Sequence, residues 1–213
     1  MYGLKRAFTM LELVMVIVVI GILAAIAIPR FERDRVQEAA DNILSAIRYT
    51  QHLALLDDKT DPADSQWQKK LWKISFTDSG TNSYYTISSD EDKDGHVDKA
   101  ECAIDPANGK YMYHLNTNPV QADESENVLI GKKYGVERIT TAGGCSAVKH
   151  IGFDILGRPH VSLGSADNIY SSYMRDDCNI TFEIAGVPDE EANMTITIMA
   201  ETGYAYIVGR ENL

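Results

Sequence analysis

Basic residues are scarce in this 213-residue chain, because 20 Lys and Arg stand against 31 Asp and Glu, giving a formal net charge of -11. Binding to nucleic acid needs clustered Lys and Arg, so the composition disfavours it. Cysteine is also rare, with three in all. Hydrophobic residues make up 45% and charged residues 24%. These averages exclude a disordered chain, a collagen-like repeat and a polytopic membrane protein.

Motifs of the common catalytic sites are missing as well. The chain contains no Walker loop, no serine-elbow motif and no H-E-x-x-H, and its five histidines form no short metal motif. His150 and His160 flank an expected hairpin, where packing or surface roles account for them. We therefore expect a protein that is not an enzyme.

One long apolar run stands out against this acidic background. Residues 8–28 contain 18 hydrophobic residues out of 21, and Glu12 is their one charge. A run of this length suits a membrane anchor whose basic start, Lys5 and Arg6, stays in the cytoplasm. A cleaved signal peptide, with a cut after Ala27 and a secreted soluble calcium protein as the product, is an alternative. The carboxylate of Glu12 within the apolar core argues against that alternative, because a charge there is costly.

The segment around Glu12 carries a resemblance to a known family. Residues 5–13 read KRAFTMLEL and precede the apolar run. They resemble the prepilin leader of type IV pilins and pseudopilins, although Ala7 stands where the family usually has Gly. The resemblance implies that residues 1–7 are a leader that a prepilin peptidase removes between Ala7 and Phe8. It also implies methylation of the new Phe8 amine and assembly through Glu12, which would meet the Phe8 amine of a neighbouring subunit.

The sequence after Pro29 is expected to continue the helix, but as an amphipathic segment in place of an apolar one. Apolar residues recur at helical spacing from Phe31 to Leu55, and charged residues fill the other faces. We expect residues 8–28 to form a transmembrane and assembly helix, kinked at Pro29, and residues 29–58 its amphipathic periplasmic part. Turn-like residues from Lys59 onward end it.

Residues 59–213 have the pattern of a β-rich globular head. Short runs of β-type residues alternate with Gly, Asn, Asp and Pro turns. The expected fold is therefore α+β and pilin-like, with a long N-terminal helix packed on an antiparallel β-sheet. The candidate strands are residues 71–77, 84–88, 111–115, 128–130, 148–155, 160–163, 178–184, 194–199 and 204–208.

Two of the expected hairpins carry a second resemblance. Residues 151–159 read IGFDILGRP and residues 196–204 read ITIMAETGY. They look like the minor pseudopilins of the type II secretion H-type and the related FimT-like minor pilins. This resemblance favours a minor subunit over the major subunit of a filament.

Residues 90–101, DEDKDGHVDKAE, match the twelve-residue EF-hand loop pattern. Oxygen ligands at this spacing suit calcium, whereas zinc would favour His or Cys. A solvated acidic loop is the alternative interpretation. The flanks do not look helical, so we expect the loop to brace the head and not to open like a sensor. The candidate ligands are the side chains of Asp90, Asp92, Asp94, Asp98 and Glu101, with the backbone carbonyl of His96.

The three cysteines allow one disulfide if the head is periplasmic. Cys145 follows two glycines and Cys178 opens an expected strand. We predict a Cys145–Cys178 disulfide with Cys102 free. A Cys102–Cys145 bond that fixes the calcium loop is the alternative, because sequence does not settle connectivity.

These features together predict a structural minor pilin or pseudopilin. It would be a single-pass protein of the bacterial inner membrane with a periplasmic head, in type II secretion or type IV pilus machinery. Its expected partners are other pilin or pseudopilin subunits and the prepilin peptidase. A FimT-like minor pilin that binds DNA during uptake is the alternative function. It is disfavoured because residues 103–213 hold eight basic against fifteen acidic residues.

Overall fold

The computed structural model describes residues 9–116, 119–146, 148–165, 171–187 and 193–210, and in the first helix it describes the side chains at 10–23 and from 35 onward. The predicted cleavage residues Ala7 and Phe8 lie outside the described residues, as do the side chains of Pro29 and Phe31. The elements are α1 (Met10–Leu56), η1 (Trp67–Lys70), β1 (Trp72–Thr77), β2 (Tyr84–Ser88), η2 (Lys99–Glu101), η3 (Glu126–Val128), α2 (Ile130–Tyr134), β3 (Val136–Gly143), β4 (His150–Phe153), β5 (Pro159–His160), η4 (Leu163–Ser165), β6 (Cys178–Ile184), β7 (Asn193–Ile198) and β8 (Ala205–Ile207).

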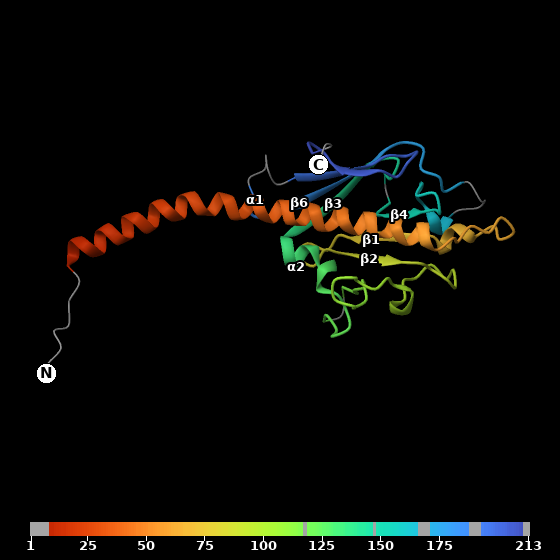
Figure 1. The fold of residues 1–213 in the computed structure, drawn as a ribbon, viewed down its shortest axis with the longest axis horizontal. Helices are drawn as coiled ribbons and strands as arrows, with labels where there is room; N and C mark the ends of the chain where they lie inside the picture. The colour runs from red at the N-terminus through yellow and green to blue at the C-terminus, as the bar shows by residue number, and fades with distance from the viewer. Residues whose placement is uncertain (1–8, 117–118, 147, 166–170, 188–192, 211–213) are drawn as a thin grey trace.

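Helix α1 has two parts with different surroundings. Its first part projects away from the head, and its second part lies along the head (Figure 1). In the second part, Ala39, Ile43 and Ile47 are buried at a spacing of four residues and Ala46 lies three residues after Ile43, as an amphipathic helix requires. Leu55 was expected on this apolar stripe but is 51% exposed, because the helix ends one residue later, at the edge of the head. Among the described residues, the structure contains no helix with the length and apolar character needed to span a membrane.

The head contains two antiparallel sheets where the sequence predicted one. The first has the strand order β2-β1-β4-β5 and the second has the order β3-β6-β7-β8. Helix α1 contacts β1 and β4 of the first sheet and β7 and β8 of the second. The fold is therefore α+β with antiparallel strands, and the helix joins the two sheets.

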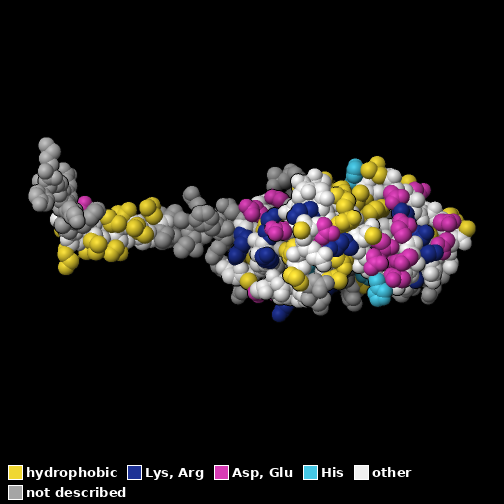
Figure 2. Space-filling view, turned by 90° about the horizontal axis from the view of Figure 1, so that it is seen from below, with side chains coloured by type: hydrophobic (Ala, Val, Ile, Leu, Met, Phe, Trp, Pro, Cys, Tyr) yellow, Lys and Arg dark blue, Asp and Glu magenta, His cyan; other side chains and the backbone are white. Residues whose placement is uncertain are grey.

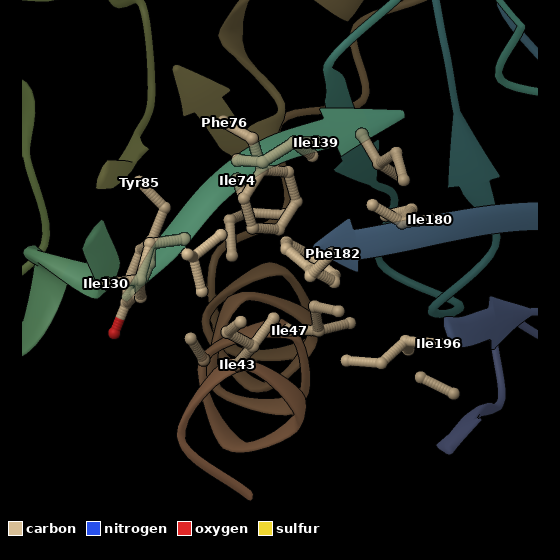
Figure 3. Packing of buried hydrophobic residues seen from close by; sticks show 14 of the residues in the cluster. Ile43, Ile47, Ile74, Phe76, Tyr85, Ile130, Ile139, Ile180, Phe182 and Ile196 are labelled. Carbon is tan, nitrogen blue, oxygen red and sulfur yellow. The ribbon is translucent and has the colours of Figure 1, made fainter. Parts of the chain in front are cut away.

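The core forms where the buried face of α1 meets both sheets. Figure 3 shows Ile43 and Ile47 of the helix pointing toward Phe182 of β6. The ring of Phe182 packs edge-on against Phe76 of β1, with ring centroids 5.3 Å apart. Fully burying one such side chain is worth about 1.5–3 kcal/mol. Residues of α1 and of both sheets therefore share one hydrophobic core, which holds the two sheets together.

Two expected strands do not form and one strand was missed. A third expected strand, residues 160–163, overlaps β5 only at His160, and Leu163 begins η4. Within residues 111–115, Tyr111 makes isolated bridges to Ile104 and Glu124, but no strand forms. Residues 128–130 end η3 and begin α2, a helix of five residues that periodicity could not reveal. The missed strand is β3, which carries charges at Glu137 and Arg138 and an irregular register there.

Candidate metal site and assembly helix

The loop of residues 90–101 leaves the end of β2 and returns to it. The backbone N–H of Ser89 donates a hydrogen bond of 3.1 Å to the carbonyl oxygen of Glu101, and Cys102 forms an isolated bridge with Ser88. The short helix η2 makes up the last turn of the loop. The flanks are thus a strand and a single 3-10 turn, and both ends of the loop are held at one edge of the first sheet.

Asp90 lies at the base of this loop and is 2% exposed. Its Oδ2 accepts a hydrogen bond of 3.1 Å from the backbone N–H of Gly95 and lies 3.8 Å from Nζ of Lys73. Its Oδ1 is buried and has no hydrogen-bond partner among the described residues. A buried carboxylate oxygen without a partner costs free energy. This atom therefore fits a cation as its missing partner.

Asp92 and Asp94 lie next to Asp90. One carboxylate oxygen from each of the three residues lies within 4.8 Å of the other two. Asp92 Oδ1 accepts a hydrogen bond of 3.1 Å from the N–H of Asp94, and Asp94 Oδ1 accepts one of 2.7 Å from the N–H of His96. These local turns hold two exposed carboxylates beside a buried one. Hard oxygen ligands at this separation suit a cation such as calcium.

The sharp turn of the loop depends on Gly95. Its φ is +83°, and a Cβ atom built there would meet no atom within 4 Å. Glycine is therefore required by the backbone conformation and not by lack of space. The turn brings the N–H of Gly95 to Asp90, five residues earlier.

The structure does not bring every predicted ligand into the group of three aspartates. Asp98 is exposed and lies outside the group. Glu101 also lies outside it, and its Oε1 accepts a hydrogen bond of 2.8 Å from the backbone N–H of Glu91. The ring of His96 is exposed, and the backbone of His96 takes part in the turn. Asp98, Glu101 and the His96 carbonyl therefore remain predicted ligands.

Lysine side chains surround the loop and fix it to the rest of the head. Lys59 lies 2.5 Å from Glu91, and Lys93 lies 2.6 Å from Asp64. Burial lowers the pKa of Lys59, but hydrogen bonds to Asp57 and Glu91 outweigh this and raise it. The contact with Lys93 lowers the pKa of the Asp64 carboxyl. Figure 2 shows acidic side chains crowded on part of the head, with lysines and arginines among them.

Glu12 lies in the first turn of α1. Thr9 is the N-cap, and its side-chain oxygen accepts a hydrogen bond of 3.2 Å from the backbone N–H of Glu12. Acidic residues in a first turn interact favourably with the helix dipole. The large hydrophobic side chains from Met10 to Leu23 are 47% to 85% exposed, and Figure 2 shows this apolar segment projecting beyond the head. A helix that is apolar on all sides needs a partner or an apolar surrounding.

A disulfide joins Cys145 to Cys178, with their Cα atoms 5.1 Å apart. It is the pairing that the sequence favoured, and Cys102 is free and buried. A Cβ atom on Gly143 would lie 2.1 Å from the carbonyl oxygen of Asp177, so only glycine fits beside the bond. The disulfide ties the segment after β3 to the start of β6. Burial, with the nearby charges of Glu101 and Asp98, raises the pKa of Cys102 to about 12.

A polar cluster in the hairpin between β4 and β5 was not predicted as a unit. Asp154 accepts hydrogen bonds from the backbone N–H of Arg158 (2.9 Å) and from its Nε (2.8 Å), and His160 Nε2 lies 3.5 Å away. His160 Nδ1 lies 2.8 Å from Ser172 Oγ. Ser172 and His160 are at most 1% exposed, so this group of Ser, His and Asp faces the interior of the head. Burial raises the pKa of Asp154, but the hydrogen bonds from His160 and Arg158 hold it at about 2.

Curated relatives link this chain to filament proteins. Two proteins of Pseudomonas aeruginosa, both named fimbrial protein, match it at 31% identity over 103 residues and 30% identity over 97 residues. These matches support a relationship to the pilin family. They cover 44% and 41% of this chain, and the chain spans 65% and 62% of the length of these relatives. No family model and no solved structure matches the chain.

Proposed function

We propose that this protein is a structural minor pilin or pseudopilin subunit of a filament in type II secretion or type IV pilus machinery. The observation that carries the proposal is the exposed apolar part of α1, with Glu12 as its one charge from Met10 to Leu23. Such a surface is stable when other apolar helices or lipid cover it. The fimbrial relatives support the same interpretation.

Glu12 would direct the packing of subunits. A carboxylate in an apolar bundle is costly unless it is paired with a positive charge. Removal of residues 1–7 by a prepilin peptidase would leave an amine on Phe8. The Glu12 carboxylate of one subunit would pair with the Phe8 amine of its neighbour, and this pairing would set the order of addition. Before assembly, residues 8–28 would hold the subunit in the inner membrane.

The head would lie in the periplasm. The Cys145–Cys178 disulfide suits an oxidising compartment. The two hairpins whose sequences resemble those of minor subunits lie close together. A Cβ atom on Gly203 of one hairpin would lie 2.1 Å from the carbonyl oxygen of Gly157 in the other. Membership of the H-type and FimT-like group is proposed from the sequence resemblance of these two hairpins.

The loop of residues 90–101 would hold a structural calcium ion. The support is the group formed by Asp90, Asp92 and Asp94, together with the buried Oδ1 of Asp90, which has no partner among the described residues. Calcium would offset the repulsion among these carboxylates and fix the loop against β2. Calcium sites outside the cytoplasm bind at about 10⁻⁴–10⁻³ M and still fill.

Substitution of Glu12 tests the assembly function. Glu12→Val in the full-length chain should leave the head folded and the protein membrane-associated, but reduce the filament fraction at least tenfold. Glu38→Val is the matched control, because Glu38 is an exposed acid on the same helix. It should assemble like the wild type. Assembly of Glu12→Val at the wild-type level would refute the proposal.

A further inference from the structure

A lysine lies behind the candidate metal site. Lys73 belongs to β1, where it pairs with Ser88 of β2 and Gly152 of β4, so it extends from the middle of the first sheet. It is 9% exposed. Its Nζ lies 3.8 Å from Oδ2 of Asp90. A nearly buried ammonium group thus lies beside the most buried carboxylate of the loop.

The alternation of β1 explains this placement. Ile74 and Phe76 belong to the hydrophobic core of the head. Lys73 and Ser75 alternate with these core residues and so lie on the other face of the strand. They line a cavity of about 170 Å³ together with Asp90 and Gly95 of the loop. One face of β1 therefore contributes to the core, and the other face lies against the loop of residues 90–101.

The same cavity offers Lys73 a second position. His150 of β4 also lines it, and its Nε2 is buried with no hydrogen-bond partner among the described residues. Burial, and then the charge of Lys73, lowers the pKa of His150, so its ring is neutral at pH 7. The unprotonated nitrogen of a neutral imidazole accepts a hydrogen bond from an ammonium group.

We propose that Lys73 is a competing cation built into the loop, which pairs with Asp90 when calcium is absent and weakens calcium binding. The inference rests on the calcium site proposed above. Calcium and the Lys73 ammonium group repel each other across a buried carboxylate, where charges are poorly screened. On calcium binding, the side chain withdraws from Asp90 into the cavity beside His150. Lys73 thereby keeps the empty loop folded and places the calcium affinity in the weak extracellular range.

Substitution of Lys73 tests this inference by calcium titration calorimetry on the full-length chain in detergent. Lys73→Gln and Lys73→Met remove the charge, and Met keeps the length of the apolar stem. We expect each to bind calcium at least tenfold more tightly than the wild type. Lys73→Arg keeps the charge and should bind within threefold of the wild type. Lys93→Gln removes a charge from the outer side of the loop, where Lys93 pairs with Asp64, and should also stay within threefold.

The outcomes separate this inference from the calcium site itself. Calcium binding by the wild type with unchanged affinity in Lys73→Gln and Lys73→Met would overturn the role of Lys73 and leave the site intact. The absence of calcium binding in the wild type and in every variant would refute the site and the inference with it. If Lys73→Gln does not fold without calcium, Lys73→Met provides the comparison. A lower melting temperature in both variants with unchanged affinity would show a structural role alone.

Discussion

Gly203, in the turn between β7 and β8, packs directly against the backbone carbonyl of Gly157, in the turn between β4 and β5. A Cβ atom on Gly203 would lie 2.1 Å from that oxygen, and the φ of Gly203 is +67°. The side-chain amide of Gln51 on α1 donates a hydrogen bond of 2.6 Å to the carbonyl oxygen of Gly203. The two sheets and the helix thus meet at one glycine.

Gly203→Ala should therefore lower the free energy of unfolding by about 3 kcal/mol or more, because it adds a backbone clash to the cost of a left-handed conformation. Gly109→Ala is the matched control, since Gly109 has a φ of +71° and open space around its Cβ position. It should cost about 1–2 kcal/mol. Denaturant unfolding measures both values, and equal losses would contradict the contact.

Removal of the disulfide should destabilise the head strongly. The bond joins residues 33 positions apart, and loop-closure entropy predicts a loss of about 3–4 kcal/mol for the Cys145→Ser/Cys178→Ser variant. Cys102→Ala should cost about 1 kcal/mol. Thiol labelling of the wild type should find no reactive thiol in the folded state and one after unfolding, because Cys102 is buried with a pKa raised to about 12. Two thiols or more after unfolding without reductant would contradict the bond.

Asp154 should make stability depend on acid pH. Its pKa in the folded state, about 2, lies below the value of about 3.9 of an unfolded chain, so the folded state favours the ionised carboxylate. The resulting stabilisation, about 2–3 kcal/mol, is present above about pH 4 and is lost as the pH falls through 2. Asp154→Asn should be less stable than the wild type at pH 6, and the difference should shrink toward pH 2.

Denaturant unfolding at a series of pH values checks this dependence. Glu38→Gln, on the exposed face of α1, serves as the control and should match the wild type throughout. A stability difference between Asp154→Asn and the wild type that stays constant from pH 6 to pH 2 would show that the carboxylate charge of Asp154 is not involved.

Calcium should stabilise the folded chain through the loop of residues 90–101. At a calcium concentration ten times the dissociation constant, the gain is about 1.4 kcal/mol, seen as a rise in melting temperature. Asp92→Ala should abolish the response, because it removes one of the three grouped carboxylates. Glu38→Gln changes an exposed acid outside the loop and should respond like the wild type. A rise of equal size in Asp92→Ala would place the calcium elsewhere.

The strands that sequence predicted well have clear patterns. β2 and β6 begin and end where the apolar runs of residues 84–88 and 178–184 do. β3 was missed because Glu137 and Arg138 interrupt its alternation at a register shift, where pairing with β6 and not composition defines the strand. The five residues of α2 are too few for a helical period to show.

The residues of the candidate site also fall into those that the sequence predicts and those that it misses. The spacing of Asp90, Asp92 and Asp94 was visible because local turns set their geometry. Lys73 was missed, since its role depends on the pairing of β1 with two other strands, which one sequence does not reveal. Its signal was a charged residue within a strand whose other residues carry no charge. The cluster around Asp154 was missed because Ser172 reaches His160 from a distant segment.

The mass of the mature N-terminus tests the central claim, that this chain is a filament subunit of the pilin kind, most directly. Mass spectrometry of the protein purified from the membrane and filament fractions gives it. We expect a chain that begins at Phe8 and carries one methyl group on its amine. A chain that begins at Ile28 after cleavage behind Ala27, or one that retains Met1, would contradict the claim.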